Sequence, residues 1–154
     1  MNVQYILIDD NNAEHRDLSI YRTGRINRVR LEDKSYTIYS TIELDAHDYA
    51  AIFHYGIVEA MNELHFISES GNGLDSWDEA FLHHSALSAL LRIIRRCGES
   101  IDPQKKETIL LGWQNQPVGV AWLRLIDPVK TAAFLRKFDT FIVESEGYDL
   151  EFIL

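Results

Sequence analysis

Apolar and polar residues alternate along much of the chain in runs that are typical of β-strands. Val3–Ile8 is a mainly apolar run that ends at four polar residues, which is the pattern of a strand followed by a turn. Ile26–Leu31 alternates between apolar and polar residues, and Ser35–Leu44 is rich in Tyr, Thr and Ile. Because a charged tripeptide separates these two runs, they predict a β-hairpin.

Three later runs extend this pattern. Thr108–Gln114 and Val118–Ile126 are apolar stretches on either side of Asn115–Pro117, and they predict a second hairpin. Large apolar residues occupy consecutive positions in both stretches, so we expect these strands to be covered on both faces. Leu150–Leu154 alternates again and predicts a closing strand.

A period of three to four residues replaces the alternation between residues 46 and 64. Asp45 precedes this segment as an N-cap, and Asp48 follows at the position that completes a weak capping box. Gly56 should weaken the helix without ending it. The segment predicts one amphipathic helix of about five turns. Its apolar face consists of Ala46, Tyr49, Ala50, Phe53, Ile57, Ala60, Met61 and Leu64.

The clearest local signal in the chain is a capping box at residues 76–79, which read Ser-Trp-Asp-Glu. It predicts that a second helix begins at Ser76. This helix should end near Cys97, because the glycine that follows it, Gly98, is a typical helix stop.

A third helix is predicted to begin at Asp127, an N-cap that Pro128 follows at the first helical position. Its end stays open, because residues 140–143 fit a strand as well as a helix. An apolar stripe at helical spacing supports the helix and consists of Phe134, Phe138 and Phe141.

The order of these elements, β-ββ-α-α-ββ-α-β, predicts an α+β fold. We expect residues 1–154 to form a single α+β domain, with a mainly antiparallel sheet of about five to six strands packed with three main helices. A length of 154 residues suits one ordinary domain. Hydrophobic residues make up 46% of the chain and charged residues 25%, which is the balance of a globular protein.

The sequence predicts a cytoplasmic protein. No apolar run approaches the roughly 18 residues that cross a bilayer, so we expect no membrane contact. Residues 1–10 contain no basic side chain and end on two aspartates, which argues against a secretory signal. The single cysteine, Cys97, excludes an intramolecular disulfide and fits a reducing compartment. We expect its thiol to be buried and unreactive, at a helix C-terminus that raises its pKa.

Charge is distributed unevenly along the chain. The net charge of −9 argues against nucleic acid as the main ligand, because phosphate binding needs a surplus of Lys and Arg. Residues 35–91 contain no Lys or Arg at all. This acidic block either steers a basic partner or is a solvated face that serves solubility. The block contains nine carboxylates, which is as many as the net negative charge of the whole chain. They are Glu43, Asp45, Asp48, Glu59, Glu63, Glu69, Asp75, Asp78 and Glu79.

The histidines do not predict a metal site. His47, His54 and His65 share one side of the predicted first helix, but a spacing of seven residues is about 10.5 Å along a helix. Ligands of one zinc ion lie within about 2 Å of the metal, so we expect structural or surface histidines here. His83 and His84 are adjacent on the predicted second helix, where their rings would point apart and His83 would face the core. No cofactor and no metal are expected.

One face of the predicted second helix carries residue types that dominate protein interfaces. The face either binds a partner or is covered by another helix or loop. Its members lie opposite the Leu–Ile stripe, within about 80° of one another, and are Trp77, Phe81, His84, Ser88, Arg92 and Arg95.

Together these features favour a non-catalytic binding protein that neutralises a basic protein partner. The most specific form of this hypothesis is a bacterial immunity protein that inhibits a nuclease-type toxin, an analogy of character rather than of sequence. Its carboxylates would stand in for the nucleic-acid backbone, and its aromatic residues would hold the complex. The candidate partner-binding residues are Glu59, Glu63, Glu69, Asp75, Trp77, Asp78, Phe81, His84 and Arg92.

Two alternatives stay open. A subunit or adaptor of a larger assembly would use the same aromatic and arginine face. A small hydrolase or transferase would use His54 or His84 as an acid–base group, with a carboxylate such as Glu59 or Asp78. The sequence shows no convergence of such groups, so it predicts no catalytic residue and no enzyme.

Overall fold

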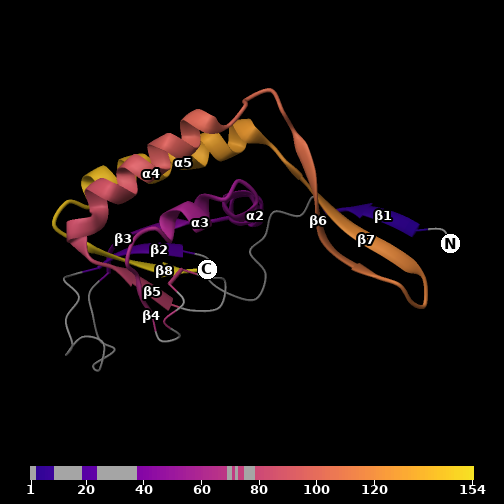
Figure 1. The fold of residues 1–154 in the computed structure, drawn as a ribbon, viewed down its shortest axis with the longest axis horizontal. Helices are drawn as coiled ribbons and strands as arrows, with labels where there is room; N and C mark the ends of the chain where they lie inside the picture. The colour runs from indigo at the N-terminus through magenta and orange to yellow at the C-terminus, as the bar shows by residue number, and fades with distance from the viewer. Residues whose placement is uncertain (1–2, 9–18, 24–37, 69–70, 72, 75–78) are drawn as a thin grey trace.

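The chain folds into helices packed on a five-stranded sheet, and a three-stranded sheet projects from this body (Figure 1). The computed structural model describes residues 3–8, 19–23, 38–68, 71, 73–74 and 79–154. The helices in these ranges are α2 (Ala46–His54), α3 (Ile57–Met61), α4 (Leu87–Ser100) and α5 (Pro128–Glu144), with a 3-10 turn η1 (His84–Ala86). The strands are β1 (Val3–Leu7), β2 (Ser19–Thr23), β3 (Ile38–Glu43), β4 (Ile67–Ser68), β5 (Glu79–Leu82), β6 (Glu107–Gln114), β7 (Gly119–Ile126) and β8 (Asp149–Ile153).

The predicted α+β fold is confirmed, and its strands are divided between two mostly antiparallel sheets. The larger sheet has the order β3-β2-β8-β5-β4, and each of its pairs is antiparallel. The smaller sheet has the order β1-β7-β6, with β1 parallel to β7. The predicted closing strand, β8, lies at the centre of the larger sheet between β2 and β5.

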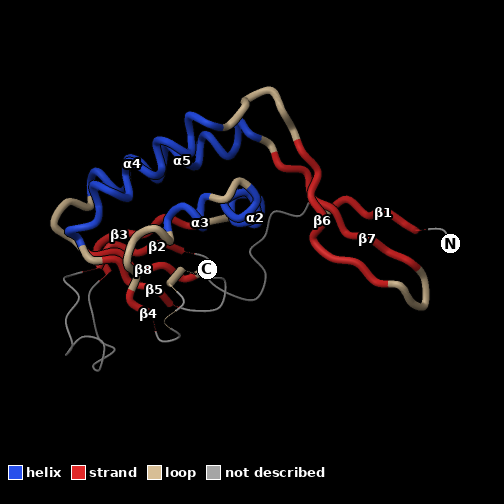
Figure 2. The backbone as a smooth tube through the Cα atoms, in the orientation of Figure 1, coloured by secondary structure: helices blue, strands red, loops and turns tan. Residues whose placement is uncertain are grey.

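The hydrophobic core lies between the five-stranded sheet and the helices, which cover one side of that sheet (Figure 2). Phe152 is fully buried on β8, and its ring contacts Phe66 and Phe138 with centroid distances of 5.3 and 6.3 Å. The helices α4 and α5 pack against each other above this sheet. The buried face of α4 follows a helical period and consists of Leu87, Leu90, Ile93 and Ile94.

Most strands predicted from alternation are confirmed. The strands β1, β3, β6, β7 and β8 coincide with predicted apolar runs to within a few residues. The hairpin of β6 and β7 pairs antiparallel as predicted. The strand that pairs with β3 is Ser19–Thr23, whereas the predicted partner, Ile26–Leu31, lies outside the described residues.

The prediction of one helix over residues 46–64 is wrong, because the chain breaks at Gly56 into α2 and α3. Asp45 caps α2 as predicted, and its carboxylate accepts a hydrogen bond from the Asp48 N–H at 2.8 Å. Gly56 has a φ of +70°, in the left-handed region that a side chain disfavours. The break redirects the chain so that both short helices bury apolar residues, among them Ile52, Ile57, Val58 and Met61.

The predicted second helix is also wrong over residues 79–86, and its predicted start at Ser76 lies outside the described residues. Residues 79–82 form β5, α4 begins at Leu87, and residues 75–78 lie outside the described part of the chain. Ala80 and Leu82 are fully buried and pair with Phe152 and Leu150 of β8. A capping box contributes about 1 kcal/mol, whereas burying a leucine side chain contributes about 1.5–3 kcal/mol. Pairing in the central sheet therefore outweighs the local helix signal.

Two further predictions about these elements are corrected by the structure. Gly98 does not end the second helix, because α4 continues to Ser100. The predicted cover on both faces is wrong for β6, since Leu110, Leu111 and Trp113 are exposed, whereas the consecutive residues Val120 and Ala121 of β7 are both buried. Apolar residues at consecutive positions therefore lie on an exposed strand in β6 and on a mostly buried strand in β7.

The third helix begins as predicted, and the structure shows where it ends, which the sequence left undecided. The Asp127 carboxylate accepts a hydrogen bond from the Val129 N–H at 2.9 Å, with Pro128 at the first helical position. The helix continues to Glu144, so residues 140–143 are helical. Across the described ranges, no helix combines the length and the apolar character that a membrane span requires.

Asp127→Ala should lower the free energy of unfolding by about 1 kcal/mol, because it removes the side-chain acceptor at the start of α5. Urea denaturation of both proteins measures the difference. The matched control is Asp127→Asn, which keeps an acceptor oxygen at this position and should retain most of the stability. Equal losses in both variants would mean that the carboxylate charge, and not the cap, stabilises this helix.

Candidate protein-binding surface

The three-stranded sheet forms a projection that we call the β-arm, made of β1, β6, β7 and the turn between β6 and β7. In Figure 1 it extends away from the helices and from the larger sheet. The main core cluster of the described residues takes no side chain from the β-arm. All five residues of β1 are exposed, so this strand is held by its pairing with β7 rather than by burial.

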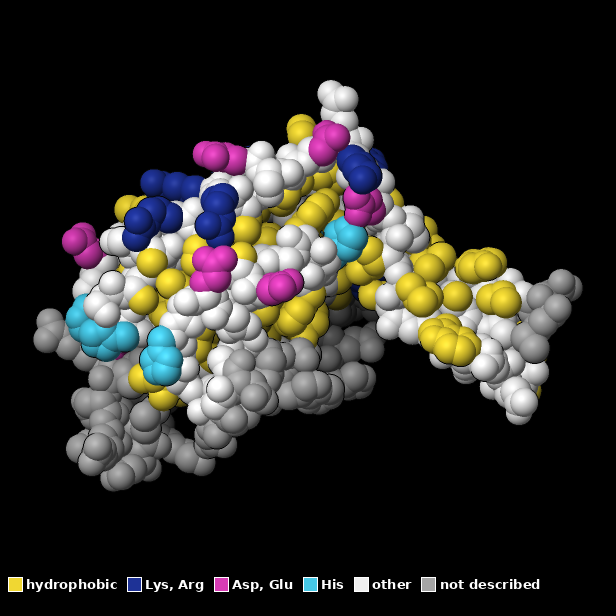
Figure 3. Space-filling view, viewed as in Figure 1, with side chains coloured by type: hydrophobic (Ala, Val, Ile, Leu, Met, Phe, Trp, Pro, Cys, Tyr) yellow, Lys and Arg dark blue, Asp and Glu magenta, His cyan; other side chains and the backbone are white. Residues whose placement is uncertain are grey.

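Large apolar side chains are exposed on both faces of the β-arm. Tyr5 is 72% exposed and Trp113 is 63% exposed. Tyr5 and Ile6 are consecutive residues of one strand, so their side chains point to opposite faces, and both are exposed. Figure 3 shows such side chains gathered on the projection. The nine exposed members are Val3, Tyr5, Ile6, Leu7, Leu110, Leu111, Trp113, Val118 and Leu125.

The surface of the β-arm is almost free of charge. Residues 3–8 and 108–123 contain no Asp, Glu, Lys or Arg. The charged residues of β6 and β7 are Glu107, at the first position of β6, and Arg124, which is 8% exposed. Apart from these two residues, the β-arm therefore offers an uncharged, apolar contact surface.

Polar contacts tie the base of the β-arm to the body. Glu107 bonds to the His54 ring at the end of α2 and to Lys105, whose Nζ lies 3.1 Å from its Oε1. The hydrogen bonds from Lys105 and then from His54 hold the pKa of Glu107 below its usual range. His54 is therefore a link between two elements, and its carboxylate partner is Glu107 rather than Glu59.

The structure does not bring the predicted partner-binding residues onto one helical face. Phe81 is half-buried in β5, His84 is half-buried in η1, and Arg92 is exposed on α4. Glu59 and Glu63 are exposed on and just after α3. The other predicted members, Glu69, Asp75, Trp77 and Asp78, lie outside the described residues.

Several carboxylates on the described surface are already paired. Glu63 of the acidic block lies 3.4 Å from Arg96 of α4. Asp139 of α5 accepts two hydrogen bonds from Arg95 at 2.7 and 3.2 Å, which lowers the pKa of its carboxyl. Figure 3 shows acidic side chains interspersed with Lys and Arg over these helices. This face therefore carries mixed charge rather than a single sign.

His47 and Cys97 have structural surroundings, as predicted. The His47 ring is buried, its Nε2 accepts from the Asp127 N–H at 2.9 Å, and its Nδ1 lies 3.1 Å from Asp48 Oδ1. Cys97 is half-buried within α4, and burial raises the pKa of its thiol. The cause is therefore desolvation, and not the helix end that the sequence predicted.

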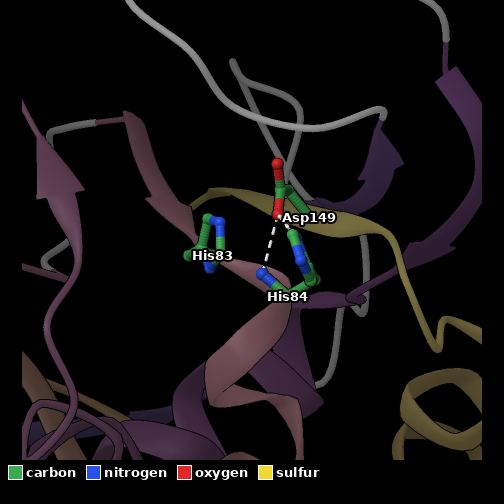
Figure 4. A group of neighbouring side chains, drawn as sticks. All are labelled: His83, His84 and Asp149. Atoms are coloured by element: carbon green, nitrogen blue, oxygen red, sulfur yellow. Dashed lines mark hydrogen bonds and ion pairs between the residues drawn. The ribbon is translucent and has the colours of Figure 1, made fainter.

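His83 and His84 lie together, which corrects the prediction that their rings point apart. Their ring centroids are 4.0 Å from each other, and His83 is exposed rather than in the core. His83 is the N-cap of the 3-10 turn η1 and His84 is its first residue, so the two do not lie on the predicted α-helix. The His84 ring faces the buried carboxylate of Asp149 (Figure 4). Its carboxylate partner is therefore Asp149 rather than Asp78.

Sequence reasoning missed the β-arm and Asp149 as functional candidates. The available signal for the β-arm is the large apolar residues at consecutive positions of residues 108–126, from which the sequence predicts strands covered on both faces. Asp149 is 65 residues from His84, and no local pattern connects them. No protein-family model, curated protein or solved structure matches this chain.

Proposed function

We propose that the protein is a non-catalytic binding protein that attaches to a basic protein partner through the β-arm. The observation that carries the proposal is the projecting sheet with large apolar side chains exposed on both faces. A three-stranded sheet gains stability when a hydrophobic face is covered. Large exposed apolar patches on a soluble protein mark contact sites.

Summed over both faces, the exposed apolar area of the β-arm is close to that of a standard interface, so a partner that uses all of it would contact both faces. Its nine large apolar side chains retain between 40% and 72% of their exposed surface. With roughly 200 Å² for each large side chain, they present on the order of 900 Å². One partner contributes about 800 Å² to an interface of standard size. Tyr5 and Trp113 are the aromatic anchors of this surface.

Charge favours a basic partner over a second copy of the chain. Two copies would bring together two bodies that each carry a net charge of −9, and these would repel each other. The uncharged β-arm does not attract a partner over long distances. Long-range attraction would come from the net negative charge of the body, which would raise the association rate with a basic partner. The apolar contacts of the β-arm would keep the dissociation rate low. A nuclease-type toxin domain has the required basic character, so the immunity-protein hypothesis is the specific form of this proposal.

The test compares the tagged full-length protein with an arm variant, Tyr5→Ser with Trp113→Ser. The matched control is Val129→Ser with Val143→Ser, which removes two apolar side chains of α5 that are 58% and 53% exposed. Each protein is used as bait in a native extract of its source, and the captured protein is purified for rate measurements. Circular dichroism confirms that all three proteins are folded.

We expect a basic protein that binds the unchanged protein and the control equally. The arm variant should dissociate at least about 30-fold faster, since one aromatic anchor contributes about 2 kcal/mol. The association rate should fall about tenfold or more between low and physiological salt. Equal dissociation rates for the arm variant and the control would place the contact elsewhere. A stable dimer of the purified chain that the arm variant dissociates would contradict the basic partner.

A further inference from the structure

We propose that His83, His84 and Asp149 form a binding site for a divalent transition-metal ion. Each residue offers one ligand atom, and the three atoms lie within 4.8 Å of one another. Figure 4 shows the two rings beside the carboxylate, where the end of β5 meets the first residue of β8. The site is distinct from the β-arm and does not depend on the proposed function.

The backbone positions the carboxylate of this site. Asp149 is 0% exposed, and its Oδ1 accepts a hydrogen bond from the His84 N–H at 2.7 Å. The same oxygen lies 2.9 Å from His84 Nδ1. The strands that carry the two residues are neighbours, since Leu82 pairs with Leu150. The carboxylate and one imidazole are therefore held together by the central sheet, before any ion binds.

The ring nitrogens of this site leave capacity for an ion. His84 Nδ1 faces Asp149 Oδ1 at 2.9 Å, and an ion held between these two atoms would replace the hydrogen bond that they share. His83 Nδ1 accepts from the Ser85 N–H at 3.2 Å and lies 2.8 Å from Ser85 Oγ, contacts that an exposed side chain exchanges readily. His47 differs, because both its nitrogens are engaged inside the protein. A second group with ligand spacing, Asp45, His47 and Asp48, is therefore a structural link.

The geometry fits a tetrahedral ion after a small adjustment. Ligand atoms around a zinc ion with bonds of about 2.0–2.2 Å lie about 3.3–3.5 Å apart. The exposed His83 side chain can close the remaining distance by rotation, because it is not packed in the core. His84 keeps 27% of its side chain exposed, so an ion can reach the site from solvent.

The donor set selects the class of ion. Two imidazole nitrogens with one carboxylate oxygen suit Zn²⁺, Co²⁺ or Ni²⁺, whereas Mg²⁺ and Ca²⁺ prefer ligands that are all oxygen. Three protein ligands leave a coordination position for water or for a ligand atom of another molecule. The bound ion would connect the end of β5 to the start of β8 and would stabilise the folded chain.

The test uses the metal-stripped, untagged full-length protein and Co²⁺ as the probe, because its visible absorption reports coordination. We compare the unchanged protein with His83→Ala, His84→Ala and Asp149→Asn. The matched control is His65→Ala, which removes an exposed histidine outside the site. His83 is exposed, so its variant should fold even if the Asp149 variant is destabilised. Zn²⁺ titration with thermal unfolding provides the second measurement.

We expect one Co²⁺ per chain, with binding at least about tenfold weaker in the His83 and His84 variants and unchanged in the control. Zn²⁺ at about 100 times its Kd should raise the Tm by about 5 °C or more in the unchanged protein. The same addition should raise the Tm of the His83 variant by about half as much or less, because binding that is tenfold weaker or more removes at least about half of the stabilisation. Co²⁺ binding in the His83 and His84 variants that is as tight as in the unchanged protein would overturn the proposal. Absence of binding up to millimolar Co²⁺ would overturn it as well.

Discussion

Phe152→Ala is expected to lower the free energy of unfolding by about 3–5 kcal/mol, which is a large part of the total stability of a domain. Phe152 is fully buried on the central strand β8. Its ring connects the sheet to Phe66 and to Phe138 of α5, at centroid distances of 5.3 and 6.3 Å. Removing it leaves a cavity that both layers border, and neither can close it without moving the other.

Urea denaturation at neutral pH measures this loss, and Phe53→Ala is the matched control. Phe53 is 37% exposed on α2, and its ring contacts Tyr49 at a centroid distance of 5.0 Å. The same substitution should cost far less at this position, because less apolar surface is lost and water fills the space. Similar losses at the two positions would contradict a core centred on β8.

The alternating pattern predicted strands well, because alternation arises from the geometry of the backbone itself. In β5, Ala80 and Leu82 are buried on one face, whereas Glu79 is exposed and Phe81 is half-buried on the other. The same four residues were nevertheless assigned to a helix, because the capping box at residues 76–79 overlaps them. That motif reports a local preference, whereas pairing between β5 and β8 joins residues about 70 positions apart.

The candidate sites were less predictable, because they depend on contacts that no local pattern records. His84 and Asp149 meet only because β5 and β8 are neighbours in the sheet. The β-arm illustrates a different limit. Apolar residues on both faces of a strand indicate cover, but they do not distinguish cover within the chain from cover by a partner. The sequence of β6 therefore indicated an apolar strand correctly, but the cover that it predicted is absent from the described part of the chain.

Two glycines show how the same residue type acts in opposite ways. The sequence predicted that Gly56 lies inside a helix and that Gly98 ends one, and the structure reverses both predictions. Gly56 separates α2 from α3 with a φ of +70°, where a Cβ would meet no other atom within 4 Å. The cost of a side chain at Gly56 is therefore backbone strain rather than a steric clash. Gly98 lies within α4, where a Cβ would meet Leu135 Cδ1 at 3.7 Å, an ordinary contact.

Alanine should therefore have opposite effects at the two positions. Gly56→Ala should lower the free energy of unfolding by about 1–2 kcal/mol, because it forces an L-residue into the left-handed region. Gly98→Ala should raise it by about 0.5–1 kcal/mol, because alanine restricts the unfolded chain and favours the helix. Urea denaturation of the two variants measures the difference. If Gly56→Ala is neutral or stabilising, residues 46–64 form one continuous helix. If Gly98→Ala is destabilising, α4 ends at this glycine, and the helix boundaries that the sequence predicted are correct.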